Sequence, residues 1–318
     1  MPPRSGLTVV AMGGNSLLDP SLPPTVTSQF EITFRALRPM AELLVRGERL
    51  VLTHGNGPQI GFLQLRSDLA RGQLHEVPLD SLVADTQGAL GYMIQRALRQ
   101  HLRTLGAHVA IASIVTEVVV DPGDRAFGEP TKPVGRFYSA EEAHARRAQG
   151  WQMVDDAGRG FRRVVASPAP VEIVQLDIIR LLVDSGVATI ACGGGGIPVT
   201  RDEGGLLQGV EAVIDKDRTS ALLAAGLAAE RLMITTGVDA VYRGYRSGAP
   251  ERLGDVTVGE LERLHAAGEF PPGSMGPKIE AAIQFVRGGG RRATICRPED
   301  LVAAFDGATG THVHEEQA

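Results

Sequence analysis

The sequence predicts an α/β protein in which helices cover both faces of a mainly parallel sheet. Short apolar segments alternate with longer segments whose apolar residues recur at helical spacing, a pattern typical of such folds. Glycine-rich turns follow four of the apolar segments, as at the carboxyl ends of parallel strands. The chain has 318 residues, 43% of them hydrophobic, so it is long enough for one large domain or two closely packed lobes.

The first third of the chain shows this alternation clearly. Apolar runs predict strands at Leu7–Met12 and at residues 49–53 and 109–120. Helical periodicity predicts helices at residues 26–44, 59–71 and 82–105, and Gly47 is expected to stop the first of them. Strands that alternate with helices in this way favour a parallel sheet that is buried on both faces.

Residues 121–169 interrupt the alternation. This segment contains Pro122, Pro130 and Pro133, the charged run at residues 141–147, the single tryptophan Trp151 and an apolar–basic run at residues 161–165. We expect it to form a protruding subdomain with its own small hairpin.

The alternation resumes after this excursion. Helices are predicted at residues 173–185, 219–228, 258–267 and 278–287, and strands at residues 187–192, 231–236 and Arg292–Cys296.

Composition argues against several classes of protein. The net charge is −5 and no long basic run occurs, which is unlike a nucleic-acid-binding protein. No apolar stretch approaches the ~20 residues of a membrane helix, and the start of the chain does not resemble a signal peptide. Two cysteines make no disulfide framework, so a reducing cytoplasm is expected. His312 and His314 match no metal-ligand spacing and are expected in solvent, and no dedicated metal site is predicted.

The four glycine-rich turns predict an anion site. They comprise Gly13-Gly14-Asn15, Gly55-Asn56-Gly57, residues 193–196 and Gly237. Glycine lets the backbone approach an anion closely and direct its N–H groups at it. Each turn alone could be ordinary strand-to-helix connection, but the only two asparagines of the chain lie in two of them. Neither the P-loop pattern nor the dinucleotide-binding GxGxxG occurs.

The lysines are a second signal. Of 32 basic residues only three are lysines, Lys132, Lys216 and Lys278, and each lies in a turn-rich context. Phosphoryl transfer requires positive charge placed around the transferred group, and lysine supplies a compact point charge where arginine supplies a planar fork. Asp215 or Asp217 could hold the Lys216 ammonium, or could simply cap a helix.

Ten stretches in order along the chain, among them AMGGNSLL, LTHGNGPQIG, GEPTKPVG, GVEAVIDKDRTSALLA and GSMGPKIEAAIQF, resemble the carbamate kinases of the amino acid kinase superfamily. The resemblance covers almost the whole chain. It implies a three-layer αβα sandwich, a homodimer, and transfer of a phosphoryl group between ATP or ADP, with Mg²⁺, and carbamate or carbamoyl phosphate. It also implies a substrate-side lobe at about residues 1–198, with the protruding subdomain at about 121–169, and a nucleotide-side lobe at about 199–318.

The resemblance also implies roles for individual residues. Gly13, Gly14, Asn15, Gly55, Asn56 and Gly57 would surround carbamate and the phosphoryl group. Lys132 would reach in from the excursion, Lys216 and Lys278 would contact phosphates, and Asp215 would orient these basic side chains. The nucleotide would also meet Gly194, Gly195, Thr236, Asp239, Val241, Tyr242, Met275 and Gly276.

The sequence departs from the family pattern on the nucleotide side. Gly237 follows Thr236 where an aspartate is usual, and residues 243–248 lack the usual glycine-lysine-proline. Nucleotide affinity is therefore expected to be altered more than phosphoryl chemistry. Two alternatives stay open: a related kinase acting on another small carboxylate, and a non-catalytic sensor of carbamoyl phosphate or nucleotide.

Overall fold

The computed structural model describes residues 6–14, 21–23, 25–156, 158–245, 248–271 and 273–316. Asn15, one of the expected site residues, lies outside them. Among the described residues no helix is long and apolar enough to cross a membrane.

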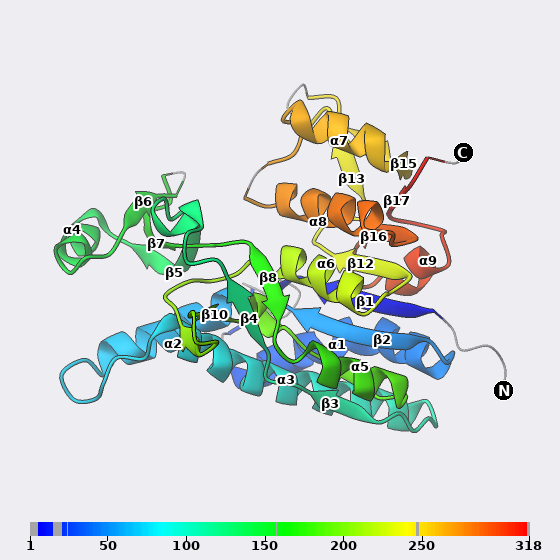
Figure 1. Cartoon of the computed structure of the whole chain (residues 1–318), viewed down its shortest axis with the longest axis horizontal. Coiled ribbons are helices and arrows are strands. Elements are labelled where there is room, and N and C mark those ends of the chain that lie inside the picture. The colour runs from blue at the N-terminus through cyan, green and yellow to red at the C-terminus, as the bar shows by residue number, and fades with distance from the viewer. Residues whose placement is uncertain are drawn as a thin grey trace.

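An eight-stranded sheet forms the centre of the molecule (Figure 1). All of its neighbouring strands pair in parallel except β16 and β17. In spatial order the strands are β15 (Asp255–Thr257), β17 (Thr311–His314), β16 (Arg292–Cys296), β12 (Arg231–Thr235), β1 (Leu7–Met12), β2 (Arg49–His54), β9 (Ala188–Ile190) and β3 (Ile111–Ser113).

Helices bury both faces of this sheet, which confirms the expected three-layer α/β fold. Alternate residues of β1 point to opposite layers: Val9 packs in one core and Val10 in the other. The first core is covered by α5 (Leu176–Asp184), α6 (Lys216–Gly226), α7 (Val258–Ala266) and α8 (Gly276–Arg287). The second is covered by α1 (Val26–Val45), α3 (Leu79–Thr104) and α9 (Leu301–Phe305).

One predicted strand proved to be two strands in different sheets. The run at residues 109–120 divides into β3, at the edge of the central sheet, and β4 (Glu117–Val120), which belongs to a four-stranded sheet. Between them Ile114 still donates its N–H to Ile190 O, and two residues later Thr116 donates its N–H to the Gln87 side chain instead. The other strands of the second sheet are β11 (Leu207–Gly209), β10 (Ile197–Arg201) and β8 (Pro170–Ile173).

The excursion forms a protruding subdomain, which extends to the left in Figure 1. It holds more structure than the expected hairpin. Its three strands, β5 (Lys132–Tyr138), β7 (Phe161–Val165) and β6 (Met153–Asp155), are antiparallel, and α4 (Ala140–Ala148) packs against them around Tyr138, Ala143 and Met153. The first turn of α4 has a capping box between Ser139 and Glu142. Helix α2 (Gly57–Leu69) lies against β5.

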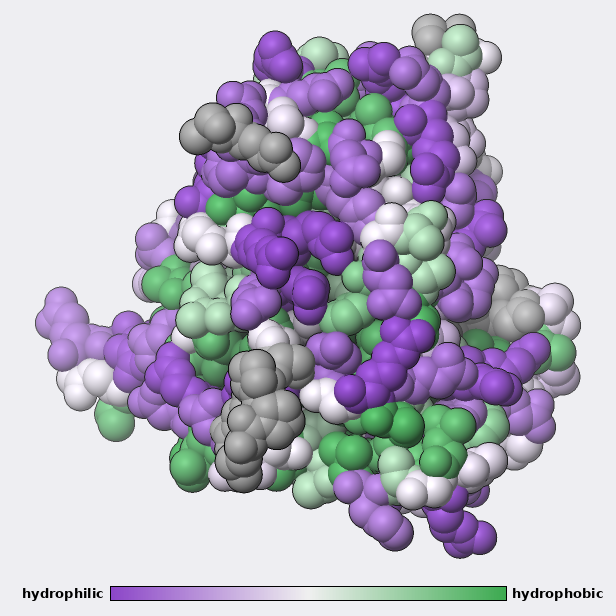
Figure 2. Space-filling view, turned by 90° about the vertical axis from the view of Figure 1, so that its right-hand side faces the viewer, coloured by the Kyte–Doolittle hydropathy of each residue, from purple (hydrophilic) through white to green (hydrophobic). Residues whose placement is uncertain are grey.

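The C-terminal part contains elements that hydropathy did not predict. A two-stranded hairpin of β13 (Val241–Arg243) and β14 (Glu251–Leu253) follows β12, and β17 closes the chain. His312, expected in solvent, is buried in β17, where its Nδ1 lies 3.1 Å from Thr294 Oγ1. Figure 2 views the molecule from the right-hand side of Figure 1, opposite the protruding subdomain, and shows mainly hydrophilic side chains on this face.

Candidate active site

Glycine-rich turns meet at the carboxyl ends of neighbouring parallel strands. Gly13 and Gly14 follow β1, residues 55–57 follow β2, and residues 193–195 form a single 3₁₀ turn after β9. They border a cavity of about 330 Å³. Its lining also includes Pro58, Ile60, Lys132, Pro133, Val134, Val213, Ile214, Asp215, Lys216, Asp217, Thr235, Thr236, Gly237, Gly273 and Lys278.

The turns approach one another so closely that only glycine fits. A Cβ atom on Gly55 would lie 2.7 Å from the Gly14 nitrogen. Gly194 has φ +70°, and a Cβ atom there would lie 2.0 Å from the Asn56 amide nitrogen. The backbone itself therefore forms this wall of the cavity, and an anion bound there would meet N–H groups instead of side chains.

Two buried side chains hold this wall in place, and motif reasoning missed both. Thr86 Oγ1 accepts a 2.8 Å hydrogen bond from the side-chain amide of Asn56. This bond fixes the Asn56 side chain at the N-terminus of α2. Gln87 donates from its amide nitrogen to Gly193 O at 2.9 Å and to Thr116 O at 3.1 Å. Both come from α3 and begin the stretch TQGALGYMIQ, which resembles the family but to whose residues the sequence analysis assigned no role.

Lys132 reaches the cavity from the first residue of β5. Its ammonium lies 3.1 Å from Asp215 Oδ2 and 3.4 Å from Ile214 O. The other carboxylate oxygen of Asp215 accepts hydrogen bonds from the N–H groups of Asp217 and Arg218. Asp215 thus caps α6 and holds Lys132 at the same time, so it combines a structural role with an electrostatic one.

Lys216 and Lys278 share a single carboxylate. Lys216, in the first turn of α6, pairs with Asp217 Oδ1, and Lys278, in the first turn of α8, donates to Asp217 Oδ2 at 3.0 Å. The Asp217 side chain is only 4% exposed. Sequence reasoning weighed Asp217 as a partner of Lys216 alone. The spacing Asp-Lys-Asp was the available signal, but nothing in it points to Lys278, which is 61 residues away.

The charges in the cavity perturb one another. Burial alone would raise the pKa of Asp215, but Lys132 and Lys216 outweigh it and hold that pKa well below its usual range. Burial lowers the pKa of Lys216, and Asp217 opposes this effect. The described lining of the cavity includes three ammonium groups and two carboxylates, which favours an anionic ligand.

His54, at the end of β2, is buried beneath the second glycine turn. Its Nδ1 lies 3.1 Å from the carbonyl oxygen of Gly55, which can only accept, so Nδ1 carries the proton. Burial lowers the pKa of His54 to about 4. His54 is therefore neutral at pH 7 and adds no charge to the cavity.

The expected nucleotide residues divide into two groups. Gly194, Thr236, Lys216 and Lys278 line the cavity together with Gly237. The others do not line it. Tyr242 donates a 3.1 Å hydrogen bond to Asp239, and the buried Val241 donates its N–H to Thr311 Oγ1. Gly195, Met275 and Gly276 are not among the lining residues either. Their contact with a nucleotide stays a prediction.

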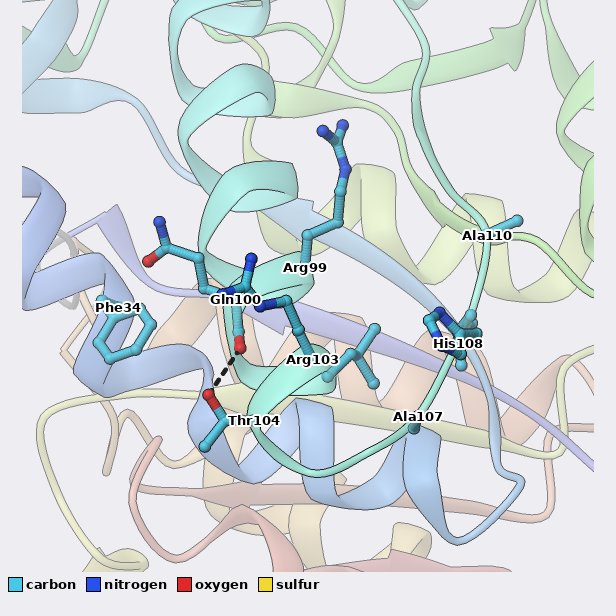
Figure 3. A pocket seen from close by; sticks show the side chains of 10 residues that line it. Phe34, Arg99, Gln100, Arg103, Thr104, Ala107, His108 and Ala110 are labelled. Atoms are coloured by element: carbon cyan, nitrogen blue, oxygen red, sulfur yellow. Dashed lines mark hydrogen bonds between the residues drawn. The ribbon is translucent and has the colours of Figure 1, made fainter.

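A larger cavity, of about 800 Å³, lies at the far end of α3 (Figure 3). Arg99, Gln100 and Arg103 of α3 border it, with Phe34 of α1 on one side and His108 on the segment leading to β3. No lysine and no glycine turn lines it. We therefore place the chemistry in the smaller cavity.

No cluster of three or more histidine, cysteine, aspartate or glutamate side chains suited to a metal ion occurs within the described residues. The two carboxylates of the cavity, Asp215 and Asp217, are already paired with lysines.

Comparisons with known proteins give one consistent result. The sequence profile of the amino acid kinase family matches residues 6–297. A carbamate kinase from Pyrococcus horikoshii is 44% identical over 98% of this chain and 99% of its own. A carbamate kinase-like protein from Escherichia coli is 44% identical over 96% of this chain and 98% of its own. A solved carbamate kinase from Giardia lamblia, bound to AMP-PNP, covers 98% of this chain and 99% of its own with a TM-score of 0.91 and 37% identity.

Proposed function

The chain belongs to the amino acid kinase family, and on that premise we propose how its residues carry out the carbamate kinase reaction. Relatives named carbamate kinase cover nearly the whole chain at identities such as 44% and 41%, and the chain is accordingly a carbamate kinase and a phosphotransferase. The observation that carries the residue assignments is the convergence of all three lysines on two carboxylates within one cavity.

We assign the acceptor end of the cavity to the first two glycine turns and Lys132. The backbone N–H groups around Gly14 and Gly55 would hold the carboxylate of carbamate, and Asn56 would fix its orientation. Asn15 has the same expected role but lies outside the described residues. Lys132 would neutralise charge on the oxygen that joins carbamate to phosphorus. Of the three lysines, it is the one that the protruding subdomain supplies to the cavity.

We assign the nucleotide end to Lys216, Lys278 and the turn at Thr236. The two lysines project from the first turns of α6 and α8, where the helix dipoles also favour phosphate. Asp217 pairs with both ammonium groups and holds them in place. Binding of phosphate oxygens would then require little rearrangement, which is how preorganised charge assists transfer.

Transfer in the direction of ATP formation proceeds as one displacement at phosphorus. A terminal oxygen of the ADP β-phosphate forms the new P–O bond while the bond from phosphorus to the carbamate oxygen breaks. The electron pair of that bond leaves with carbamate. No side chain needs to accept a proton, so positioning and charge neutralisation are the whole contribution of these residues.

Magnesium enters this proposal with the nucleotide. Mg²⁺ commonly binds through substrate phosphates, water and one or two carboxylates, and it would add positive charge beside the phosphates. Asp215 and Asp217 are the carboxylates of the cavity, and both hold lysines. We therefore assign the ion no dedicated protein cage.

A coupled assay of ATP formation from ADP and carbamoyl phosphate tests the proposed residue roles. We expect turnover that requires Mg²⁺ and that is lost in Lys216→Ala, with acetyl phosphate a much poorer donor. Equal rates with acetyl phosphate would favour the related kinase of another small carboxylate. Absence of turnover above the Lys216→Ala background at millimolar substrates would favour the sensor and refute the roles assigned to these residues.

Gly237 offers a test of the nucleotide side. A Cβ atom on this exposed glycine would have nothing within 4 Å, so an aspartate fits there without a clash. Gly237→Asp should lower the KM for ADP, because a carboxylate adds a hydrogen-bond acceptor for the nucleoside, an interaction worth about 1–3 kcal/mol when the bound nucleotide buries it. The kcat should change little. An unchanged KM in steady-state kinetics would mean that the backbone of this turn already makes the contact.

We further propose that the chain works as a homodimer, with the acceptor lobe at about residues 1–198 and the nucleotide lobe at about 199–318. Two features support the dimer. The outer edge of β3 is unpaired in the described sheet, and Tyr92 on α3 and Val115 after β3 expose 65% and 56% of their surface. The lobe division follows from the lysines, because Lys216 and Lys278 come from the later part of the chain and Lys132 from the earlier part.

We also propose a cytoplasmic location and a role in arginine metabolism. Cys192 and Cys296 are free and buried, as suits a reducing compartment. Carbamoyl phosphate is a product of arginine breakdown in the pathways that carbamate kinases serve, and the reaction would recover its phosphoryl group as ATP. Measurement of carbamoyl phosphate in cells that lack the enzyme during growth on arginine tests this role, and an unchanged level would refute it.

A further inference from the structure

We propose that Asp68 is a positioning residue for Lys132, although it lies at the opposite end of β5 from that lysine. The inference rests on the role proposed for Lys132 in phosphoryl transfer. Asp68 would help to fix the protruding subdomain to the rest of the molecule, and in this way it would set the position of the Lys132 ammonium in the cavity.

The subdomain contacts the main body near Lys132 through apolar packing and a glycine pair. Val134 and Val165 pack in a small core with Ile60 and Val213. Beside them, a Cβ atom on Gly61 of α2 would lie only 3.0 Å from Gly135 Cα, so the backbones of α2 and β5 touch. These contacts, together with the 3.2 Å ion pair between Arg163 of β7 and Glu211, hold the near end of β5.

Among the described residues, the far end of the subdomain has one ion pair with α2. Arg146, on α4, donates to Asp68 Oδ2 at 3.1 Å, and the Asp68 side chain is only 8% exposed. The same guanidinium lies over the rings of Trp151 and Tyr138, so it belongs to the core of the subdomain. A partly buried ion pair with one well-packed partner is stronger than an exposed pair.

The Asp68–Arg146 contact can affect the cavity because β5 connects the two places. Tyr138 ends β5 next to Arg146, and Lys132 begins it, six residues or about 20 Å away at the usual rise of a strand. The contact between Gly61 and Gly135 lies between them and can serve as a pivot. Loss of the Asp68–Arg146 pair would free the far end, and rotation about the pivot would move the Lys132 ammonium relative to Asp215.

The position of Asp68 in α2 does not stabilise that helix. Asp68 occupies the last turn of that helix, where a carboxylate opposes the helix dipole. Its second partner, Arg71, is more exposed and lies 3.3 Å away. Replacing Asp68 by the isosteric asparagine therefore should not unfold α2. Asp68→Asn weakens both ion pairs, and the pair with Arg146, the less exposed of the two, should account for most of the effect.

The test is a double-mutant cycle with Lys132. Asp68→Asn should lower kcat by about 10- to 100-fold, the loss typical of a catalytic group misplaced by about 1 Å, with little change in the KM for ADP. In the Lys132→Ala background Asp68→Asn should have no further effect, because it acts only through that lysine. Asp306→Asn is the matched control, since its pair with Arg46 is about half exposed and distant from the subdomain.

Each outcome decides a separate point. An additive loss from Asp68→Asn in the Lys132→Ala background would overturn the inference, as would full activity of Asp68→Asn beside an impaired Lys132→Ala. If Lys132→Ala itself retains normal kcat, the proposed role of Lys132 fails and the inference fails with it. Thermal melting of all four variants establishes that they are folded.

Discussion

The three lysines are the residues on which the chemistry depends most, in a protein that otherwise uses arginine. Lys216 is 11% exposed, pairs with a buried carboxylate, and lines the cavity together with the glycine turns. A guanidinium is planar and wide, so it cannot occupy the place of a compact ammonium in this cavity. The choice of lysine at these positions is thus a matter of shape as well as charge.

Substitution by arginine should therefore impair each lysine while preserving its charge. We expect Lys216→Arg to lose about 10²–10³ in kcat, the usual cost of one misplaced charge at a transition state. Lys278→Arg should be similar and Lys132→Arg milder, because the subdomain can absorb more bulk. Arg38→Lys, at a side chain 70% exposed on α1, is the reverse control and should be neutral. Near-normal kcat in all three arginine variants would show that charge alone suffices.

His54 predicts a loss of stability in mild acid. Its folded pKa is about 4 and its ordinary value 6.5, so above pH 6.5 it is neutral in both states. As the pH falls from 6.5 to 4, His54 binds a proton in the unfolded chain but not in the folded chain, so the free energy of unfolding decreases. The free energy of unfolding should fall by about 2 kcal/mol from this residue between pH 7 and pH 5.

Denaturant unfolding at both pH values checks this expectation, with His54→Gln as the comparison. The variant should lose about 2 kcal/mol less than the wild type between pH 7 and pH 5. Equal losses in the two proteins would mean that other groups dominate the acid response and that His54 accepts a proton readily in the fold.

At the scale of single elements, the glycine turn after β9 is the most constrained. Gly194 has φ +70° and almost touches Asn56, whereas Gly106, after α3, has the same φ but nothing within 4 Å of a Cβ atom. Gly106→Ala should cost only the strain of a left-handed residue, about 1–2 kcal/mol. Gly194→Ala should cost about 1–3 kcal/mol more because it also creates a steric clash.

Thermal or denaturant unfolding of the two alanine variants measures that difference directly. We also expect Gly194→Ala to lose activity, since Asn56 must move to admit the methyl group, and Gly106→Ala to keep it. Equal destabilisation by the two substitutions would mean that the turn relaxes more easily than its contacts suggest.

The elements also show what the sequence could and could not predict. Long apolar strands and amphipathic helices around β1, β2, α1 and α3 were predicted correctly, because burial on one face imposes a period that is visible in the sequence. The division of residues 109–120 into β3 and β4 was not predicted, because hydropathy does not show which sheet a strand joins. Strands β13 and β14 are three residues long, and each has a single buried residue, Val241 or Leu253, so their pairing leaves no hydropathy signal.

The site shows the same division between local and non-local information. The glycine turns and lysines were identifiable because each is unusual within its own stretch of sequence. Thr86 and Gln87 are ordinary residues in a helix, and the pairing of Asp217 with Lys278 arises only where α6 and α8 meet. Contacts between residues far apart in the chain decide their roles, so one sequence without relatives cannot supply them.

At the scale of the whole molecule, the unpaired edge at β3 predicts association. Sedimentation analysis should give twice the 33.7 kDa mass of the chain at micromolar concentration. Tyr92→Lys and Val115→Lys should weaken the dimer, because both place a charge on the exposed apolar surface beside that edge. Leu206→Lys, at a residue 68% exposed elsewhere, should leave the mass unchanged. A single-chain mass for the wild-type protein would contradict the proposed dimer.

The protruding subdomain enters and leaves the main body through hydrogen-bonded neighbours, since Lys132 at the start of β5 pairs with Val165 at the end of β7. A segment whose two ends lie side by side has the geometry of an inserted cassette, which a host fold can gain or lose without disturbing its own core. In this protein such a cassette carries one of the three cations of the cavity. Evolution could therefore exchange the chemistry of the acceptor end as a module, while the sheet and its nucleotide end stayed as they were.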